Sequence, residues 1–245
     1  MPVNDARFVE IAADLMVRHS VQSVIIHGSR VLGEELPGSD LDVFAVSTGI
    51  HEFEERRIAD CVSGMPGNVA VDLRVTTPRG AKWAHVMSPE WRHAFFGGRR
   101  YGEWKWLPVG LPLSRQGAHD YFGDLKVQLS VAIDWGGTHE ETVTDLIRVF
   151  RREVILEAAL GISSGVPDPG SWAHLARVIG AEQETIDGVR LKRRESFGRI
   201  EPSRLVETIR ERMVATGSAL ERYAENEADR QLALLLSEEA AASVG

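Results

Sequence analysis

The 245-residue chain has little of what marks secreted or membrane proteins. It contains one cysteine, Cys61, which excludes a framework of intrachain disulfides and is compatible with a reducing compartment. No segment approaches the roughly 20 apolar residues of a membrane span. The first ten residues, MPVNDARFVE, lack the basic and apolar regions of a secretory signal. We therefore expect a cytoplasmic protein without a membrane partner.

Two common motifs for metal and phosphate binding are also absent from the sequence. The eight histidines show no His-x-x-x-His spacing, and one cysteine cannot form a zinc motif, so a zinc site is not expected. No Gly-Lys-Ser or Gly-Lys-Thr run is present, which excludes phosphate binding by a P-loop.

The net charge of −8 is concentrated in the second half of the chain. Residues 1–110 hold 12 Lys and Arg against 14 Asp and Glu, whereas residues 111–245 hold 16 against 22. Affinity for nucleic acid depends on neutralising phosphates with Lys and Arg, so a nucleic-acid partner is not expected. An acidic pocket would instead suit a cationic small molecule, although most of these acidic residues are expected to solvate helix faces.

The segment 27–46, HGSRVLGEELPGSDLDVFAV, combines a Gly-Ser turn with two aspartates. Asp40 and Asp42 are two residues apart, so on an extended strand both carboxylates point to the same side. Such a pair repels unless a cation lies between the two charges, and hard oxygen ligands favour Mg²⁺ that also carries phosphates. Gly28 and Ser29 follow a buried strand and can present backbone N–H groups and a hydroxyl to a phosphate. The neighbouring Arg30 could add positive charge to this phosphate site, or it could simply be solvated.

Gly28-Ser29, ten intervening residues and Asp40-Leu41-Asp42 between apolar residues resemble the signature of the nucleotidyltransferase superfamily of the DNA polymerase β type. Bacterial aminoglycoside, lincosamide and minimal nucleotidyltransferases share this pattern, with a further glycine here matched by Gly33. The resemblance covers roughly the first hundred residues. It implies Mg²⁺ held by the aspartates, an NTP co-substrate held at the Gly-Ser turn, and a third carboxylate on a neighbouring strand.

Asp72 is the candidate for this third carboxylate. It lies within residues 68–76, NVAVDLRVT, which alternate and are rich in β-branched residues, as is typical of a strand. The resemblance implies that Asp72 either completes the metal site with Asp40 and Asp42 or accepts the proton of an acceptor hydroxyl. The alternative is an exposed strand residue paired with Arg74.

The resemblance implies an α+β nucleotidyltransferase domain, with a mixed sheet and flanking helices, over residues 1–110, and the hydrophobic pattern predicts an all-α helical bundle over residues 111–245. In the first domain we expect helices at 5–19 and 51–62 and strands before the Gly-Ser turn, at the Asp pair and at Asp72. In the second we expect helices at 121–135, 138–159, 172–179, 202–215 and 218–237, with a solvated turn at residues 192–194.

The middle segment, residues 77–110, reads as irregular apart from a short helix that begins at Ser88-Pro89-Glu90. It holds four of the six tryptophans, which we interpret mainly as packing between domains. Trp104 and Trp106, two residues apart, are the candidates for ligand contact. In families of this shape the substrate lies between the two domains, and Lys126 and Arg148 are the cations that we expect to contact the triphosphate.

The resemblance implies transfer of an NMP, with AMP from ATP as the expected case, to a hydroxyl of a small molecule such as an aminoglycoside-like antibiotic, and the acidic second half suits a cationic acceptor. Two alternatives stay open, namely a toxin-like enzyme that modifies a protein or tRNA and a nucleotide-binding module without catalysis. The acidic second half disfavours the first alternative, and three intact carboxylates disfavour the second. A homodimer is left open.

Overall fold

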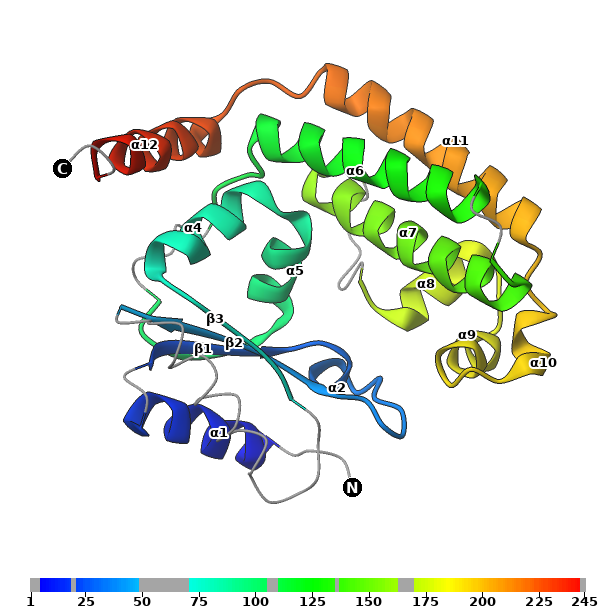
Figure 1. The fold of residues 1–245 in the computed structure, drawn as a ribbon, viewed down its shortest axis with the longest axis horizontal. Helices are drawn as coiled ribbons and strands as arrows, with labels where there is room; N and C mark the ends of the chain where they lie inside the picture. The colour runs from blue at the N-terminus through cyan, green and yellow to red at the C-terminus, as the bar shows by residue number, and fades with distance from the viewer. Residues whose placement is uncertain are drawn as a thin grey trace. The chain divides into compact units, whose positions relative to one another are not determined.

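The computed structural model describes residues 5–18, 21–48, 71–104, 110–134, 137–162 and 170–242. The chain divides into two compact units (Figure 1), of which the first comprises residues 1–85 and 94–111 and the second residues 86–93 and 112–245. Each unit has its own hydrophobic core. Within the described ranges no helix combines the length and apolar character needed to cross a membrane.

The first unit is built on a four-stranded mixed sheet with the strand order β3-β2-β1-β4. Its strands are β1 (Val21–His27), β2 (Leu41–Ser47), β3 (Val71–Thr76) and β4 (Arg99–Gly102). β1 is antiparallel to both β2 and β4, whereas β2 and β3 are parallel. The strands predicted before the Gly-Ser turn, around Asp42 and at Asp72 are therefore confirmed, although β2 begins only after Asp40. The helix predicted at residues 51–62 lies outside the described residues.

Alternation along the strands gives the sheet two different faces. On one face, Val24 and Ile26 of β1 form a core with helix α1 (Asp5–Arg18) and with Leu41, Val43 and Ala45 of β2. On the other face, Phe44 meets Phe95 in an edge-to-face contact with ring centroids 5.2 Å apart. Asp42 shares this second face with Phe44 because the two residues are two positions apart on β2. The carboxylate is therefore directed away from α1.

The expectation of an irregular segment at 77–110 is wrong for most of its length. Helix α4 (Pro78–Met87) is capped by Thr77, whose Oγ1 accepts a hydrogen bond from Gly80 N at 3.1 Å. Helix α5 (Pro89–Gly97) begins as predicted at Ser88, whose Oγ accepts from Trp91 N at 3.3 Å. Both starts combine a hydroxyl cap with proline in the first turn. Strand β4 then adds an edge to the sheet.

The second unit contains the helices α6 (Arg115–Asp134), α7 (His139–Ala159), α8 (Trp172–Ile179), α9 (Gln183–Arg190), α10 (Arg194–Phe197), α11 (Pro202–Glu221) and α12 (Glu227–Ala242). α7 packs against α6 and α11 (Figure 1), and the core is formed mainly by aliphatic residues of these three helices. The fold is therefore an α+β domain with a mixed sheet followed by a helix-rich part, as the sequence predicts.

Helix boundaries in the second unit follow local capping chemistry. Thr138 caps α7 in a reciprocal capping box, accepting from Glu141 N while Glu141 accepts from Thr138 N. The predicted break between residues 215 and 218 is wrong, because α11 runs through Gly217 to Glu221 and the chain resumes as α12 at Glu227. The short helices α9 and α10 were not predicted. Between them Lys192 lies in an exposed turn with a positive φ of 56°. The turn predicted at residues 192–194 is therefore only partly confirmed, because Arg194 begins α10.

Candidate active site

Three polar residues form a row across neighbouring strands at one end of the sheet. His27 is the Cα partner of Asp42 in the β1–β2 ladder, and Asp42 is the Cα partner of Asp72 in the β2–β3 ladder. Directly paired residues project from the same face of a sheet, so the three side chains share one face. The register thus brings Asp72 next to Asp42. It also places His27, the last residue of β1, in the same row.

Asp40 directly precedes β2 in the chain and is exposed. Gly28, which directly follows β1, lies against the side chain of Asp42. A Cβ built on Gly28 would overlap Asp42 Oδ2 and lie 2.9 Å from Asp42 Cγ. Gly28 also has φ of 81°, in the region that favours glycine. Glycine is therefore required here both by backbone conformation and by the approach of the carboxylate.

Ser29 begins the short helix α2 (Ser29–Leu32) directly after Gly28. The Gly28 carbonyl accepts from Val31 N at 3.1 Å, and the Ser29 carbonyl accepts from Glu34 N at 2.8 Å. These bonds hold the turn next to the row of polar residues. Among the described residues, no hydrogen bond engages the Ser29 hydroxyl, which is half-buried and chemically able to meet a phosphate oxygen.

Arg30 lies on α2 and contacts the backbone of the segment before β2. Its Nε donates to Ser39 O at 3.1 Å and to Asp40 O at 3.0 Å, and its Nη2 also donates to Ser39 O. The guanidinium is therefore engaged with the aspartate segment. The sequence offered only two interpretations, a phosphate contact or a solvated side chain.

Asp72 has the neighbour that the alternative interpretation anticipated. Arg74 Nη2 lies 4.0 Å from Asp72 Oδ2, and the two side chains are 64% and 49% exposed. Exposed pairs at this separation contribute little, typically 0–1 kcal/mol. The pair therefore does not commit the Asp72 carboxylate to a structural role.

The donor set of the site suits a magnesium ion that is shared with a nucleotide. Of the residues that the structure describes, no three His, Cys, Asp or Glu side chains lie close enough together to hold a metal ion alone. Mg²⁺ usually takes only one or two protein carboxylates and completes its shell with water and phosphate oxygens. Asp42, with Asp40 or Asp72, fits this requirement because Asp72 is the Cα partner of Asp42 and Asp40 lies two residues before it in the chain.

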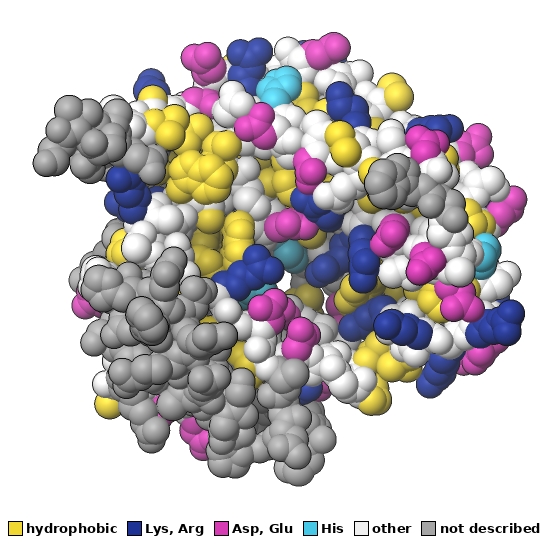
Figure 2. All heavy atoms as spheres, in the orientation of Figure 1, with side chains coloured by type: hydrophobic (Ala, Val, Ile, Leu, Met, Phe, Trp, Pro, Cys, Tyr) yellow, Lys and Arg dark blue, Asp and Glu magenta, His cyan; other side chains and the backbone are white. Residues whose placement is uncertain are grey.

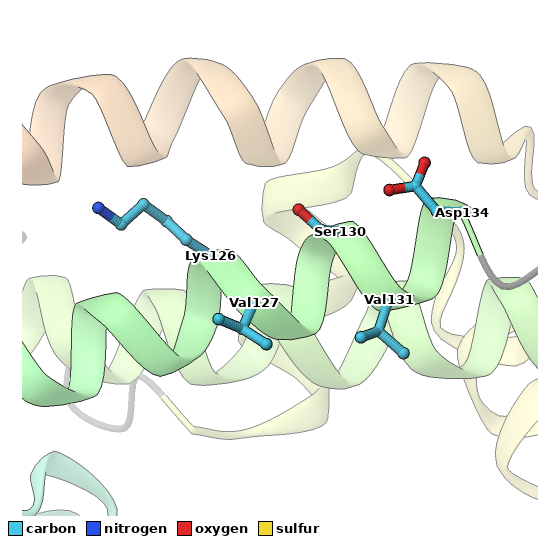
Figure 3. Close-up of a pocket in the computed structure, with 5 residues that line it drawn as sticks. All are labelled: Lys126, Val127, Ser130, Val131 and Asp134. Carbon is cyan, nitrogen blue, oxygen red and sulfur yellow. The ribbon is translucent and has the colours of Figure 1, made fainter.

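Lys126 and Arg148, the predicted triphosphate contacts, belong to the second unit. Lys126 is exposed on α6, with Nζ 5.0 Å from the centroid of the Phe122 ring. It lines a shallow pocket of about 300 Å³ with Val127, Ser130, Val131 and Asp134 (Figure 3). Arg148 is exposed on α7, and its Nη1 donates to Asp145 Oδ1 at 3.1 Å. The two cations therefore have different neighbours within the helical unit.

The other two arginines of α7 have structural partners. Arg152 donates to Glu90, Asp124 and Tyr121 over 2.9–3.1 Å. Burial, the charge of Glu90 and the Tyr121–Glu90 hydrogen bond raise the pKa of the Tyr121 hydroxyl despite Arg152.

Arg151 lies over the indole ring of Trp172, 4.9 Å from its centroid, and Arg190 approaches the same ring to 4.7 Å. Lys and Arg side chains gather around α7, α8 and α9 on the face in Figure 2, with acidic side chains among them.

Local contacts define the roles of Trp104 and Glu141. Trp104 packs against Phe95 at 6.3 Å between ring centroids and donates from Nε1 to Tyr101 O at 2.9 Å, so its described contacts are those of packing. Trp106 lies outside the described residues. Hydrogen bonds from the backbone and side chain of Thr138 lower the pKa of Glu141, consistent with its role in the helix cap.

Comparison with known proteins yields one family match. The model of the family described as a nucleotidyltransferase domain matches residues 8–63. The match contains the Gly28-Ser29 turn, Asp40 and Asp42, and it ends before Asp72. No curated protein shows significant similarity to the chain. The match supports the nucleotidyltransferase superfamily, and with it NMP transfer as the general activity.

Proposed function

We propose that the chain is a Mg²⁺-dependent nucleotidyltransferase that moves AMP from ATP to a hydroxyl of a small cationic molecule, such as an aminoglycoside-like antibiotic. The observation that carries the proposal is the β-sheet register, which sets Asp42 beside Asp72 while Gly28 closes on Asp42. Gly28 and Asp42 lie within the segment that matches the nucleotidyltransferase domain, and Asp72 follows it in the chain.

Each residue would have a defined part in the reaction. Ser29 and the backbone of its turn would bind the outer phosphates, and Asp40 and Asp42 would hold Mg²⁺. When bound, Mg²⁺ would neutralise charge on the phosphates and on the departing pyrophosphate. Asp72 would accept the proton of the acceptor hydroxyl as its oxygen bonds to the α-phosphorus and the bond from that phosphorus to the β-phosphate oxygen breaks. The products would be the adenylylated acceptor and pyrophosphate.

The acceptor class is inferred from charge. Residues 111–245 hold six more acidic than basic residues, and this part of the chain would supply the acceptor site in an enzyme of this shape. Excess negative charge attracts amine-bearing molecules and repels nucleic acid. Arg148 is the exposed α7 cation that we assign to the triphosphate, with Lys126 as a second candidate.

The test is pyrophosphate release by the full chain with each NTP, against a panel of aminoglycosides, lincosamides and other hydroxylated amines. Asp42→Asn keeps the size of the side chain but removes a charge, so we expect kcat/KM to fall more than about 100-fold. The matched control is Asp14→Asn on α1, which packs against the opposite face of the sheet and should leave the rate unchanged.

Full activity of Asp42→Asn would refute the site. Binding of ATP and Mg²⁺ without pyrophosphate release on any acceptor would instead identify a nucleotide-binding module. Transfer only to a protein or to tRNA would favour the toxin-like alternative.

A further inference from the structure

The segment that carries the two aspartates is fixed at one end by a tight turn. Ser39 N donates to Leu36 O at 2.9 Å, and Leu36 N donates to Ser39 Oγ at 2.9 Å. Gly38, at the third position of this turn, has φ of 88°, and Pro37 precedes it, as in a type II turn. The turn ends at Ser39, whereas β2 starts at Leu41. Asp40 therefore lies between two ordered elements and belongs to neither.

Arg30 spans this junction from α2. Its Nε is shared between the carbonyl oxygens of Ser39 and Asp40, at 3.1 and 3.0 Å, and Nη2 adds a further bond to Ser39 O. Hydrogen bonds from a charged donor are about twice as strong as neutral ones, and the planar fork of arginine fixes direction as well as distance. α2 follows directly on the Gly28-Ser29 turn, so one side chain connects the two halves of the site.

We propose that Arg30 is a positioning residue, which holds the Ser39 and Asp40 carbonyls and so aims the Asp40 and Asp42 carboxylates at a divalent cation. This inference rests on the proposed function, since it requires that these aspartates bind a metal ion. It replaces the phosphate-binding interpretation of Arg30. Lysine cannot reproduce the fork, although it keeps the charge.

The positive charge of Arg30 and the geometry that it imposes are expected to change metal affinity in opposite directions, so substitutions of Arg30 can separate the two effects. A positive charge close to a cation site repels the cation, so its removal alone would strengthen metal binding. Loss of the aimed geometry weakens metal binding, and disturbing groups that orient metal ligands typically costs about 10–100-fold in affinity. In Arg30→Lys the charge stays and the fork is lost, so this variant measures geometry alone. Arg30→Gln removes both.

The first measurement needs no metal. We expect hydrogen exchange of the metal-free protein to become faster in peptides that cover residues 34–42 in both Arg30 variants, with exchange elsewhere in the sheet unchanged. The matched control is Arg100→Lys on β4, an exposed arginine of the same unit, which should leave exchange in this segment as it is. Unchanged exchange in both Arg30 variants would overturn the proposal.

The second measurement is calorimetric titration of Mn²⁺ into the protein with a non-hydrolysable ATP analogue. Arg30→Lys should raise the Kd for Mn²⁺ by about 10-fold or more, while affinity for the analogue at saturating Mn²⁺ stays the same. Normal Mn²⁺ affinity, or a loss of analogue affinity at every Mn²⁺ concentration, overturns the positioning role.

Asp42→Asn distinguishes a failure of the proposed function from a failure of the positioning role of Arg30. If this variant binds Mn²⁺ normally, the proposed function fails and the role of Arg30 fails with it. If Asp42→Asn loses Mn²⁺ and Arg30→Lys does not, only the role of Arg30 is wrong.

Discussion

Glu153→Gln in the helical unit is expected to stabilise the protein at about pH 8, and to be about 3 kcal/mol less favourable relative to the wild type near pH 4.5. Glu153 is fully buried on α7. Its Oε1 accepts from Thr216 Oγ1 at 2.5 Å, and its Oε2 has no hydrogen-bond partner within the part of the chain that the structure describes. Burial, together with the nearby charge of Glu157, raises the pKa of Glu153 from 4.5 to about 7, although the hydrogen bond from Thr216 and the charge of Arg212 oppose the shift.

The change in the free energy of unfolding with pH follows from the linkage between protonation of Glu153 and folding. Between pH 4.5 and about 7 the folded protein keeps this proton while the unfolded chain loses it. The free energy of unfolding therefore falls as the pH rises, by at most about 1.4 kcal/mol per pH unit. Over the whole interval the loss approaches about 3 kcal/mol, since one pKa unit corresponds to about 1.36 kcal/mol.

Glutamine is neutral at every pH, so Glu153→Gln avoids this loss and still accepts the hydrogen bond from Thr216. Its amide N–H group needs an acceptor in place of Oε2, which can reduce the gain by about 1–2 kcal/mol. We therefore expect a net gain of about 1–3 kcal/mol at about pH 8.

Urea denaturation followed by circular dichroism, at several pH values between about 4.5 and 8, measures this difference. Glu211→Gln, the same change at an exposed position of α11, is the control and should stay within about 0.5 kcal/mol of the wild type. The argument is refuted if Glu153→Gln changes stability equally at every pH, or if it destabilises the protein at about pH 8.

Two further substitutions test the candidate active site. Gly28→Ala puts a Cβ against Asp42 and an L-residue at a φ of 81°, so we expect a lower Tm by thermal denaturation and weaker binding of Mg²⁺-ATP by calorimetry; normal binding would show that the contact does not shape the site. Asp72→Asn should lower the rate of pyrophosphate release and nearly preserve Mg²⁺-ATP affinity, since Asp40 and Asp42 already supply the carboxylates that Mg²⁺ usually takes. A parallel loss of affinity would make Asp72 a metal ligand, and an unchanged rate would remove it from the site.

The strand elements of the site could be predicted because each depends on a local pattern. The buried run before Gly28, the alternating residues around Asp42 and the β-branched residues around Asp72 all form the strands that their side chains favour. The pairing of these strands is not local. Only the register reveals that His27, Asp42 and Asp72 form one row, because a shift of one residue would send Asp72 to the opposite face.

The segment 77–110 was harder to predict because its apolar residues lack a clear period. α4 buries Ala81, His85 and Val86, a narrow stripe that includes a polar residue. Such a helix is identified better by its start, Thr77-Pro78, than by hydrophobic periodicity. The same holds for α9 and α10, which are too short to show a helical repeat.

The three arginines of α7 show where sequence reasoning reaches its limit. Arg148, Arg151 and Arg152 lie within five residues and have the same chemistry, so the sequence ranks them almost equally as phosphate ligands. Tertiary contacts separate them, since Arg152 is held by residues of α5 and α6 and Arg151 lies over an indole ring. Arg148 instead pairs with its helix neighbour Asp145, and its side chain is 70% exposed. An exposed pair of this kind is worth about 0.3–0.5 kcal/mol, so a triphosphate could displace Asp145 at little cost, and this difference makes Arg148 the α7 residue to which we assign the nucleotide.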